Sequence, residues 1–184
     1  MHAIRDNMRK GDTRKTIRNG LPAGMGVAAL VLGLSAPPAF AELRTVEQLV
    51  HGMDCAPCAY GVEKGLESLE GVEQATVSLN EGTAVVELTR DNKVSIADIR
   101  EVVRKNGFAA REARTEIGGT LARQEGKLQL VTEDGSRYEL VAAENAEEAW
   151  DKLQEIQENQ KLSLEGVVPE DESMQLQVEE VSIA

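Results

Sequence analysis

The amino-acid sequence predicts an α+β protein built from two small parts. Residues 43–114 show strand and helix patterns in the order β-α-β-β-α-β, which is typical of a two-layer sandwich with both helices on one face of a sheet. Residues 115–184 show the order β-β-β-α-β-β, which suits a small barrel. The hydrophobic content of 41% is sufficient for compact cores, so wholesale disorder is not expected.

Residues 1–41 are predicted to be a cleaved export signal (a signal peptide) and not part of the fold. A basic stretch ending at Arg18 precedes the apolar run 21–34, which is too short to span a bilayer comfortably. The run ends at Pro37-Pro38, and residues 39–41 (Ala-Phe-Ala) have the small-x-small pattern of a cleavage site. A retained N-terminal anchor is the alternative. Cleavage after residue 41 would give a periplasmic protein, in an oxidising compartment where paired cysteines can close into a disulfide.

The charge of the chain excludes some classes of partner. The formal net charge is −12, and the residues after 41 hold 14 Lys and Arg against 30 Asp and Glu. A surface this acidic repels phosphate backbones and anionic lipid. We therefore expect neither nucleic-acid binding nor stable membrane insertion after signal cleavage, whereas cations are attracted.

The first half of the sandwich begins with a strand pattern at 45–50, in which Gln48 interrupts the apolar phase. Pro57 fits only the first turn of a helix, where its missing N–H is no loss. The run 59–69 then places Val62, Leu66 and Leu69 on one helix face, and Gly71 ends it.

The second half of the sandwich begins with a hairpin. Strand patterns at 72–79 and 83–89 flank the turn Asn80-Glu81-Gly82. Ser95 is a good N-cap for a helix with Ile96, Ile99 and Val103 on one stripe, and Asn106-Gly107 stops that helix. A last strand is expected at 108–114. The completed order predicts a ferredoxin-like split βαβ sandwich.

Cys55 and Cys58 are the two cysteines of the chain and are spaced C-x-x-C at the start of the first helix. Cys55 is expected on the loop before the helix and Cys58 in its first turn, close to unpaired backbone N–H groups at the positive end of the helix dipole. This environment favours thiolate, the form that binds soft metals or attacks disulfides. Metal binding and thiol–disulfide exchange therefore compete as functions.

Residues 43–114 resemble the heavy-metal-associated domain of copper chaperones, periplasmic mercury-binding proteins and the N-termini of metal-exporting P-type ATPases. The resemblance rests on Gly52-Met53-x-Cys55-x-x-Cys58, on the element order and on Asn106-Gly107-Phe108. It implies that Cys55 and Cys58 are metal ligands, that Met53 is a buried support for the loop and that Phe108 lies beside the metal. Simple core packing is the alternative role for Met53 and Phe108.

The donor set predicts which metal ions would bind. Two thiolates select Cu(I), Zn(II) and their heavier relatives, and fewer than four protein ligands leave the site open. Asp54 stands where copper-handling members of the family usually have Thr, Ser or His. An Asp at this position resembles that in the domains of zinc-, cadmium- and lead-exporting pumps. As a third ligand it would favour Zn(II), Cd(II) or Pb(II) over Cu(I) or Hg(II). A solvated loop residue or an N-cap is the alternative for Asp54, and His51 is expected to be an exposed strand end.

Residues 115–184 resemble a small OB-type barrel in element order only, without a sequence motif. Asn145 is expected to cap the helix, Trp150 to be a core residue and Met174 to pack within a strand. The role expected for this part is to bind a partner protein or to position the metal domain. The patterns lie at 115–124, 127–131, 137–141, 146–157 (the helix), 162–168 and 174–181.

The sequence as a whole predicts an exported, non-enzymatic metal carrier, either a metallochaperone or a metal buffer. It would hold one soft ion between Cys55 and Cys58 for transfer to a metal-transporting membrane protein or to another metal-binding domain. The alternatives are a thiol–disulfide oxidoreductase and a non-catalytic adaptor. Redox proteins of the thioredoxin type share the C-x-x-C helix start, but they need a longer domain and usually a Trp just before the first Cys.

Overall fold

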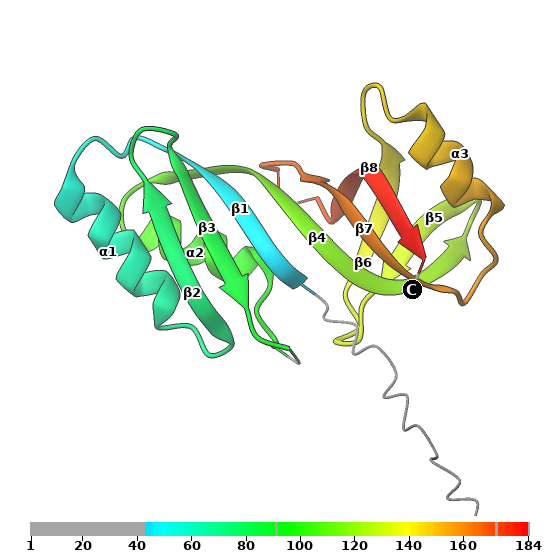
Figure 1. Cartoon of the computed structure of the whole chain (residues 1–184), viewed down its shortest axis with the longest axis horizontal. Coiled ribbons are helices and arrows are strands. Elements are labelled where there is room, and N and C mark those ends of the chain that lie inside the picture. Colours follow the sequence, from blue (N-terminus) through cyan, green and yellow to red (C-terminus); the bar gives the residue numbers. More distant parts are fainter. Residues whose placement is uncertain (1–42, 91, 172, 184) are drawn as a thin grey trace, which may run out of the picture. The chain divides into compact units, whose positions relative to one another are not determined.

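The structure is a computed structural model that describes residues 43–90, 92–171 and 173–183, so the expected export signal lies outside the described residues. The elements follow in the order β1 (Leu43–His51), α1 (Ala56–Glu67), β2 (Val72–Ser78), β3 (Thr83–Leu88), α2 (Ile96–Lys105), β4 (Ala109–Gln124), β5 (Lys127–Val131), β6 (Arg137–Ala142), α3 (Glu147–Glu155), β7 (Lys161–Val168) and β8 (Gln175–Ile183) (Figure 1). Within the described ranges, no helix is both long and apolar enough to cross a membrane.

The predicted β-α-β-β-α-β sandwich is confirmed. Its sheet has the strand order β2-β3-β1-β4 with antiparallel neighbours. The helices α1 and α2 bury Val62, Leu66, Ile99 and Val103, none of which has exposed surface. These are the apolar stripes that helical periodicity predicts, so the core of the sandwich follows directly from the sequence pattern.

The ends of the two helices follow their local chemistry. Cys55 is the N-cap of α1, and Pro57 lies in the first turn. The helix begins and ends slightly earlier than the run 59–69, and Leu69 lies just beyond its end, packed against the core. Ser95 forms a reciprocal capping box with Asp98 at the start of α2, which satisfies backbone N–H groups that the helix leaves unpaired.

The strand β4 corrects the expectation of separate strands at 108–114 and 115–124, because it is continuous from Ala109 to Gln124. On one edge, residues 109–117 pair with β1 and residues 120–124 pair with β5; on the other edge, residues 113–120 pair with β7. The edge partner changes at Gly118-Gly119. A Cβ on Gly119 would lie 2.8 Å from Leu130 Cγ, so the change of partner needs a residue without a side chain.

The strands β4 to β8 form a closed five-stranded barrel. Its pairing order is β4-β5-β6-β8-β7 with β7 returning to β4, and only the β6–β8 pair is parallel. The interior is filled by leucines without exposed surface, among them Leu121, Leu130, Leu162 and Leu176. The barrel is therefore a packed core.

Two expectations for the barrel are wrong. The N-cap of α3 is Ala146, without a side-chain hydrogen bond, and Asn145 instead has a left-handed φ of 62°, a conformation that Asn tolerates. Met174 lies just before β8 and is 47% exposed, because the strand begins one residue after it. Trp150 packs against the core, as expected.

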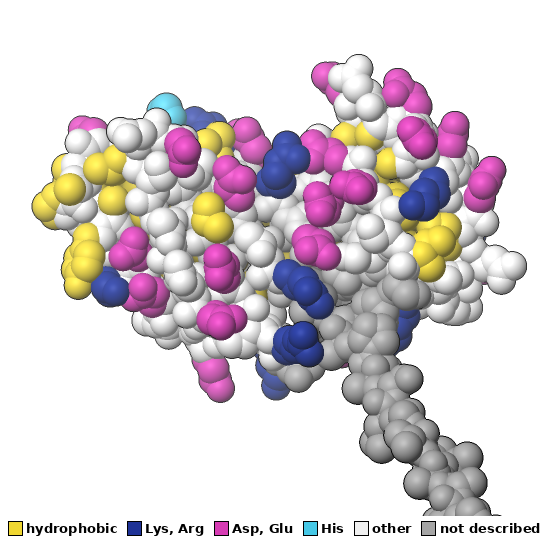
Figure 2. All heavy atoms as spheres, viewed as in Figure 1, with side chains coloured by type: hydrophobic (Ala, Val, Ile, Leu, Met, Phe, Trp, Pro, Cys, Tyr) yellow, Lys and Arg dark blue, Asp and Glu magenta, His cyan; other side chains and the backbone are white. Residues whose placement is uncertain are grey.

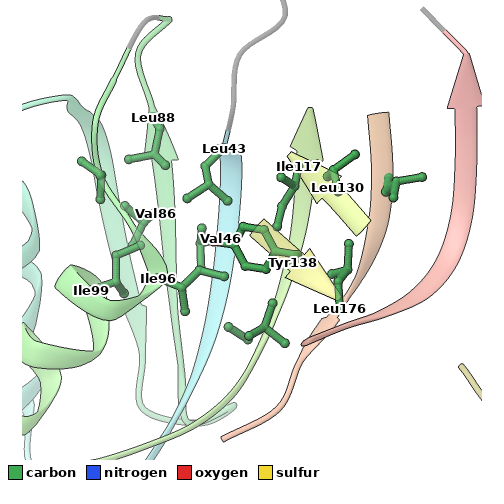
Figure 3. Packing of buried hydrophobic residues seen from close by; sticks show 14 of the residues in the cluster. Leu43, Val46, Val86, Leu88, Ile96, Ile99, Ile117, Leu130, Tyr138 and Leu176 are labelled. Carbon is green, nitrogen blue, oxygen red and sulfur yellow. The ribbon is translucent and has the colours of Figure 1, made fainter. Parts of the chain in front are cut away.

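The apolar cores of the sandwich and the barrel are contiguous. One cluster of buried side chains contains Ile99, Val86 and Val46 from the sandwich and Leu130, Tyr138 and Leu176 from the barrel, with Ile117 of β4 among them (Figure 3). The expected boundary between residues 114 and 115 falls inside β4. The shared strand thus carries side chains of both cores.

Candidate metal centre

The loop between β1 and α1 holds the residues with metal-binding chemistry. The strand ends at His51, which is exposed, as expected for a strand end. Gly52 then takes a φ of +96°, a conformation that glycine adopts without steric cost. An added Cβ on Gly52 would lie 3.9 Å from the Phe108 ring. The turn therefore places the loop after β1 beside the residue that follows α2.

Cys55 and Cys58 take the positions that the sequence predicts, the first before α1 and the second in its first turn. Their sulfurs are joined in a disulfide, with a Cα–Cα distance of 5.2 Å. The Cys58 backbone N–H donates to Cys55 Sγ at 3.2 Å. Both residues are partly exposed. Reduction of this disulfide would leave two neighbouring thiols at the helix N-terminus, where thiolate is favoured.

Asp54 joins the two cysteines in one cluster. A carboxylate oxygen of Asp54 and the Sγ atoms of Cys55 and Cys58 lie within 4.8 Å of one another. In the part of the chain that the structure describes, this is the one such group of three His, Cys, Asp or Glu side chains. The N-cap role considered for Asp54 is wrong, because Cys55 caps α1. Asp54 is exposed and so accessible to an ion.

Met53 lies in this loop, and Phe108 lies next to it, after α2. Both are partly buried and pack against the core cluster. The packing agrees with a supporting role and equally with ordinary core packing. Their roles in metal binding therefore stay predictions, as do those of the three candidate ligands.

Tyr60 is an exposed aromatic residue near the cluster that the sequence reasoning did not single out. It lies two residues after Cys58 and is 61% exposed, and Lys64 Nζ lies 5.5 Å from its ring centroid. Glu67 accepts a hydrogen bond from Lys64, and this raises the pKa of Lys64. Figure 2 shows hydrophobic side chains on the surface at the end that carries α1. Helical periodicity predicts the exposure of Tyr60, since Tyr60 falls outside the buried stripe of Val62 and Leu66.

The cluster has the donor atoms that suit a soft metal ion once its disulfide is reduced. Thiolate sulfurs prefer soft ions, and a carboxylate oxygen adds a harder donor. Three protein ligands leave a coordination position open, in contrast to the four ligands of a closed structural zinc site. An open position allows a ligand from another molecule to enter.

Comparison with known proteins places the loop in a family. The heavy-metal-associated domain profile matches residues 49–109. The mercuric transport protein periplasmic component of Shigella flexneri is 33% identical over 81 residues, which cover 44% of this chain and 88% of that protein. Copper-transporting ATPase 2 of Homo sapiens is 41% identical over 61 residues, or 33% of this chain and 4% of the ATPase. This chain thus spans most of the mercuric protein and a small fraction of the ATPase.

Among solved structures, the copper-binding domain of the P-type ATPase HMA7 is 36% identical and covers 39% of this chain and 92% of its own, with a TM-score of 0.34. The profile match contains the whole loop from Gly52 to Cys58, and the sandwich has the expected element order β-α-β-β-α-β. Because this chain matches the Shigella flexneri protein over 88% of that protein's length, it belongs to the family of heavy-metal-associated domain proteins.

Proposed function

We propose that this protein is a metal carrier that holds one soft metal ion between Cys55 and Cys58. It would act as a metallochaperone or metal buffer for a metal-transporting membrane protein or for another metal-binding domain. The observation that carries the proposal is the convergence of both sulfurs and the Asp54 carboxylate within 4.8 Å on a partly exposed loop. The Shigella flexneri relative is named as a transport component.

Transfer of the ion follows from the open coordination of the cluster. A thiolate of the partner enters the free position while Cys55 or Cys58 leaves, so the ion is never released to water. The N-terminus of α1 stabilises the remaining thiolate through its unpaired N–H groups. Cys58 lies in the first turn of α1, whereas Cys55 precedes the helix as its N-cap, so the two sulfurs differ in how close they lie to the helix.

Asp54 favours divalent ions in this proposal. Zn(II), Cd(II) or Pb(II) with two thiolates and one carboxylate forms a less charged complex than Cu(I) with the same three ligands. An additional negative charge at about 5 Å costs on the order of 1 kcal/mol in water, and more where the site is partly desolvated. Relatives are named for copper and mercury, so Cu(I) and Hg(II) are the competitors to test.

Export and the second part complete the proposal. Cleavage of residues 1–41 would leave a periplasmic protein, which agrees with the name of the Shigella flexneri relative. Residues 42–114 would form the metal domain and residues 115–184 an OB-like barrel. The five paired strands of the barrel support this assignment. It would position the metal domain or bind a partner protein.

Metal uptake by the reduced full chain tests the proposal. The protein is reduced with a dithiol, freed of reductant under inert gas and titrated with Zn(II). We expect about one equivalent to bind, and none to bind to the double variant Cys55→Ser/Cys58→Ser. His51→Ala is the matched control and should retain full uptake. Zinc bound equally by the double variant would overturn the proposal.

Competition between metals tests the role of Asp54. In Asp54→Thr, Zn(II) affinity should fall about tenfold, equivalent to about 1.4 kcal/mol, whereas Cu(I) affinity should stay the same or rise. Glu70→Gln removes an exposed charge beyond the far end of α1 and controls for net charge. Equal losses for both ions in Asp54→Thr would contradict a ligand role.

The disulfide supports thiol–disulfide exchange as a second candidate function. Exchange would require the reduced pair to reduce a disulfide substrate in the absence of metal. Such activity without metal uptake would favour this candidate over the carrier. A protein with neither property would fit the adaptor.

A further inference from the structure

A groove of about 320 Å³ lies between α2 and the barrel, away from the metal loop. Ile96 and Ala97 of α2 form one wall, and Val168 and Met174 contribute from the barrel. Met174 is 47% exposed, so its apolar side chain is accessible to a ligand in the groove. The groove thus presents apolar surface to solvent at the junction of sandwich and barrel.

Arg100 brings a buried positive charge to this groove. Its side chain is part of the lining, and the residue is only 5% exposed. Arg100 Nη2 donates to the carbonyl oxygens of Val168 at 3.0 Å and Pro169 at 2.6 Å, and Nε donates to Gln48 Oε1 at 3.3 Å. Of the acidic side chains that the structure describes, none forms an ion pair with Arg100. Neutral groups hold the guanidinium, so its charge is not compensated by contact.

Arg104 adds a second cation to the same lining. Burial, and then the charge of Arg104, lower the pKa of Arg100, while Asp171 and Glu170 act in the opposite direction. A lowered pKa means that the surroundings disfavour the positive charge. The groove is therefore locally cationic in a protein whose net charge is −12. An anion in contact with both guanidiniums would compensate their positive charge.

We propose that the groove binds a small carboxylate with an apolar tail. The carboxylate would contact Arg104 and the groove side of Arg100, since guanidinium groups pair well with carboxylates. The tail would lie along Ile96, Val168 and Met174. A cavity of 320 Å³ is at the small end of ligand sites, which span about 300–1,000 Å³, so a short tail fits better than a long one. The site is separate from the metal cluster and does not depend on its function.

Methionine methyl NMR on the full chain tests this site with octanoate as the probe. The ¹³C-methyl signal of Met174 should shift and saturate during the titration. Met53, which lies beside the metal cluster, is the internal control and should not shift. Octan-1-ol and octyltrimethylammonium have the same tail without the carboxylate and should bind at least tenfold more weakly.

Variants identify the groups that recognise the carboxylate. Arg104→Gln should weaken octanoate binding about tenfold, because it removes a hydrogen bond to a charged group. Lys105→Gln removes the adjacent exposed cation, which pairs with Glu101 outside the groove, and should have no effect. Asp171→Asn should strengthen binding, since it removes a negative charge that acts on Arg100. Absence of a Met174 shift, equal binding of all three amphiphiles, or equal losses in Arg104→Gln and Lys105→Gln would each overturn the proposal.

Discussion

At the scale of single residues, Gln48 and Arg100 form a buried polar pair that joins β1, α2 and β4. Gln48 Nε2 donates to the carbonyl oxygens of Leu49 and Arg111 at 2.9 Å each and of Glu112 at 3.2 Å. The pairing of β1 with β4 shifts register at this point. The Gln48 amide therefore satisfies carbonyl groups of a bulge whose ladder is interrupted.

Replacement of Arg100 by Met should lower the free energy of unfolding by about 2–4 kcal/mol, because buried carbonyl groups and Gln48 lose their charged donor. Chemical denaturation of the full chain measures this change. Lys105→Gln, an exposed substitution on the same helix, should stay within about 0.5 kcal/mol of the parent. A stable Arg100→Met variant would show that the pair contributes little to the fold.

At the scale of elements, β7 depends on a glycine where it pairs with β8. The register of the two strands shifts between Glu165 and Gly166, and a Cβ on Gly166 would collide with the Gln177 carbonyl oxygen. That oxygen belongs to the backbone and cannot move away without disturbing the strand pair. Gly166 therefore allows the barrel to close at its β7–β8 seam.

Gly166→Ala should destabilise the protein by more than about 2 kcal/mol, because overpacking against backbone forces the two strands apart. Urea denaturation followed by circular dichroism is the measurement. Glu165→Ala changes the exposed neighbour in the same strand and should have a small effect. Equal midpoints for both variants would mean that the seam relaxes without cost.

At the scale of the whole molecule, β4 connects the sandwich and the barrel through one continuous strand and one apolar cluster. The barrel contacts α2 through Arg100. Two ion pairs join β4 to later residues of the chain, Arg111 with Glu170 and Arg114 with Glu179. These contacts favour unfolding of both parts in a single cooperative transition.

Leu66→Ala tests this cooperativity by weakening the sandwich at α1 while the barrel is observed. Leu66 has no exposed surface, so the substitution should cost about 2–5 kcal/mol. The single tryptophan, Trp150, lies in α3 and reports the barrel by fluorescence, while circular dichroism reports the whole chain. Both signals should show the same lowered midpoint. A Trp150 midpoint that stays at the parent value would show that the two parts unfold independently.

Local patterns predicted most elements and the cluster of Asp54, Cys55 and Cys58, because their signals lie within a few residues of one another. Pro57 and the C-x-x-C spacing placed both cysteines at the start of α1. The turn residues at 80–82 located the hairpin of β2 and β3. In contrast, the prediction that Asn145 caps α3 is wrong, because a cap needs the right backbone angles. The prediction that Met174 is packed is also wrong, because the end of a strand depends on its partner strand.

The chain sequence by itself determined the βαββαβ order, the two cysteines at a helix start and the acidic Asp54 beside them, since all three depend on neighbours along the chain. Only the tertiary structure decided that β4 serves two sheets, that Gln48 and Arg100 meet and that Arg100 and Arg104 face a groove beside the barrel. The physical reason is sequence distance: Arg100 and Val168 are 68 residues apart, and no local periodicity records a contact of that range.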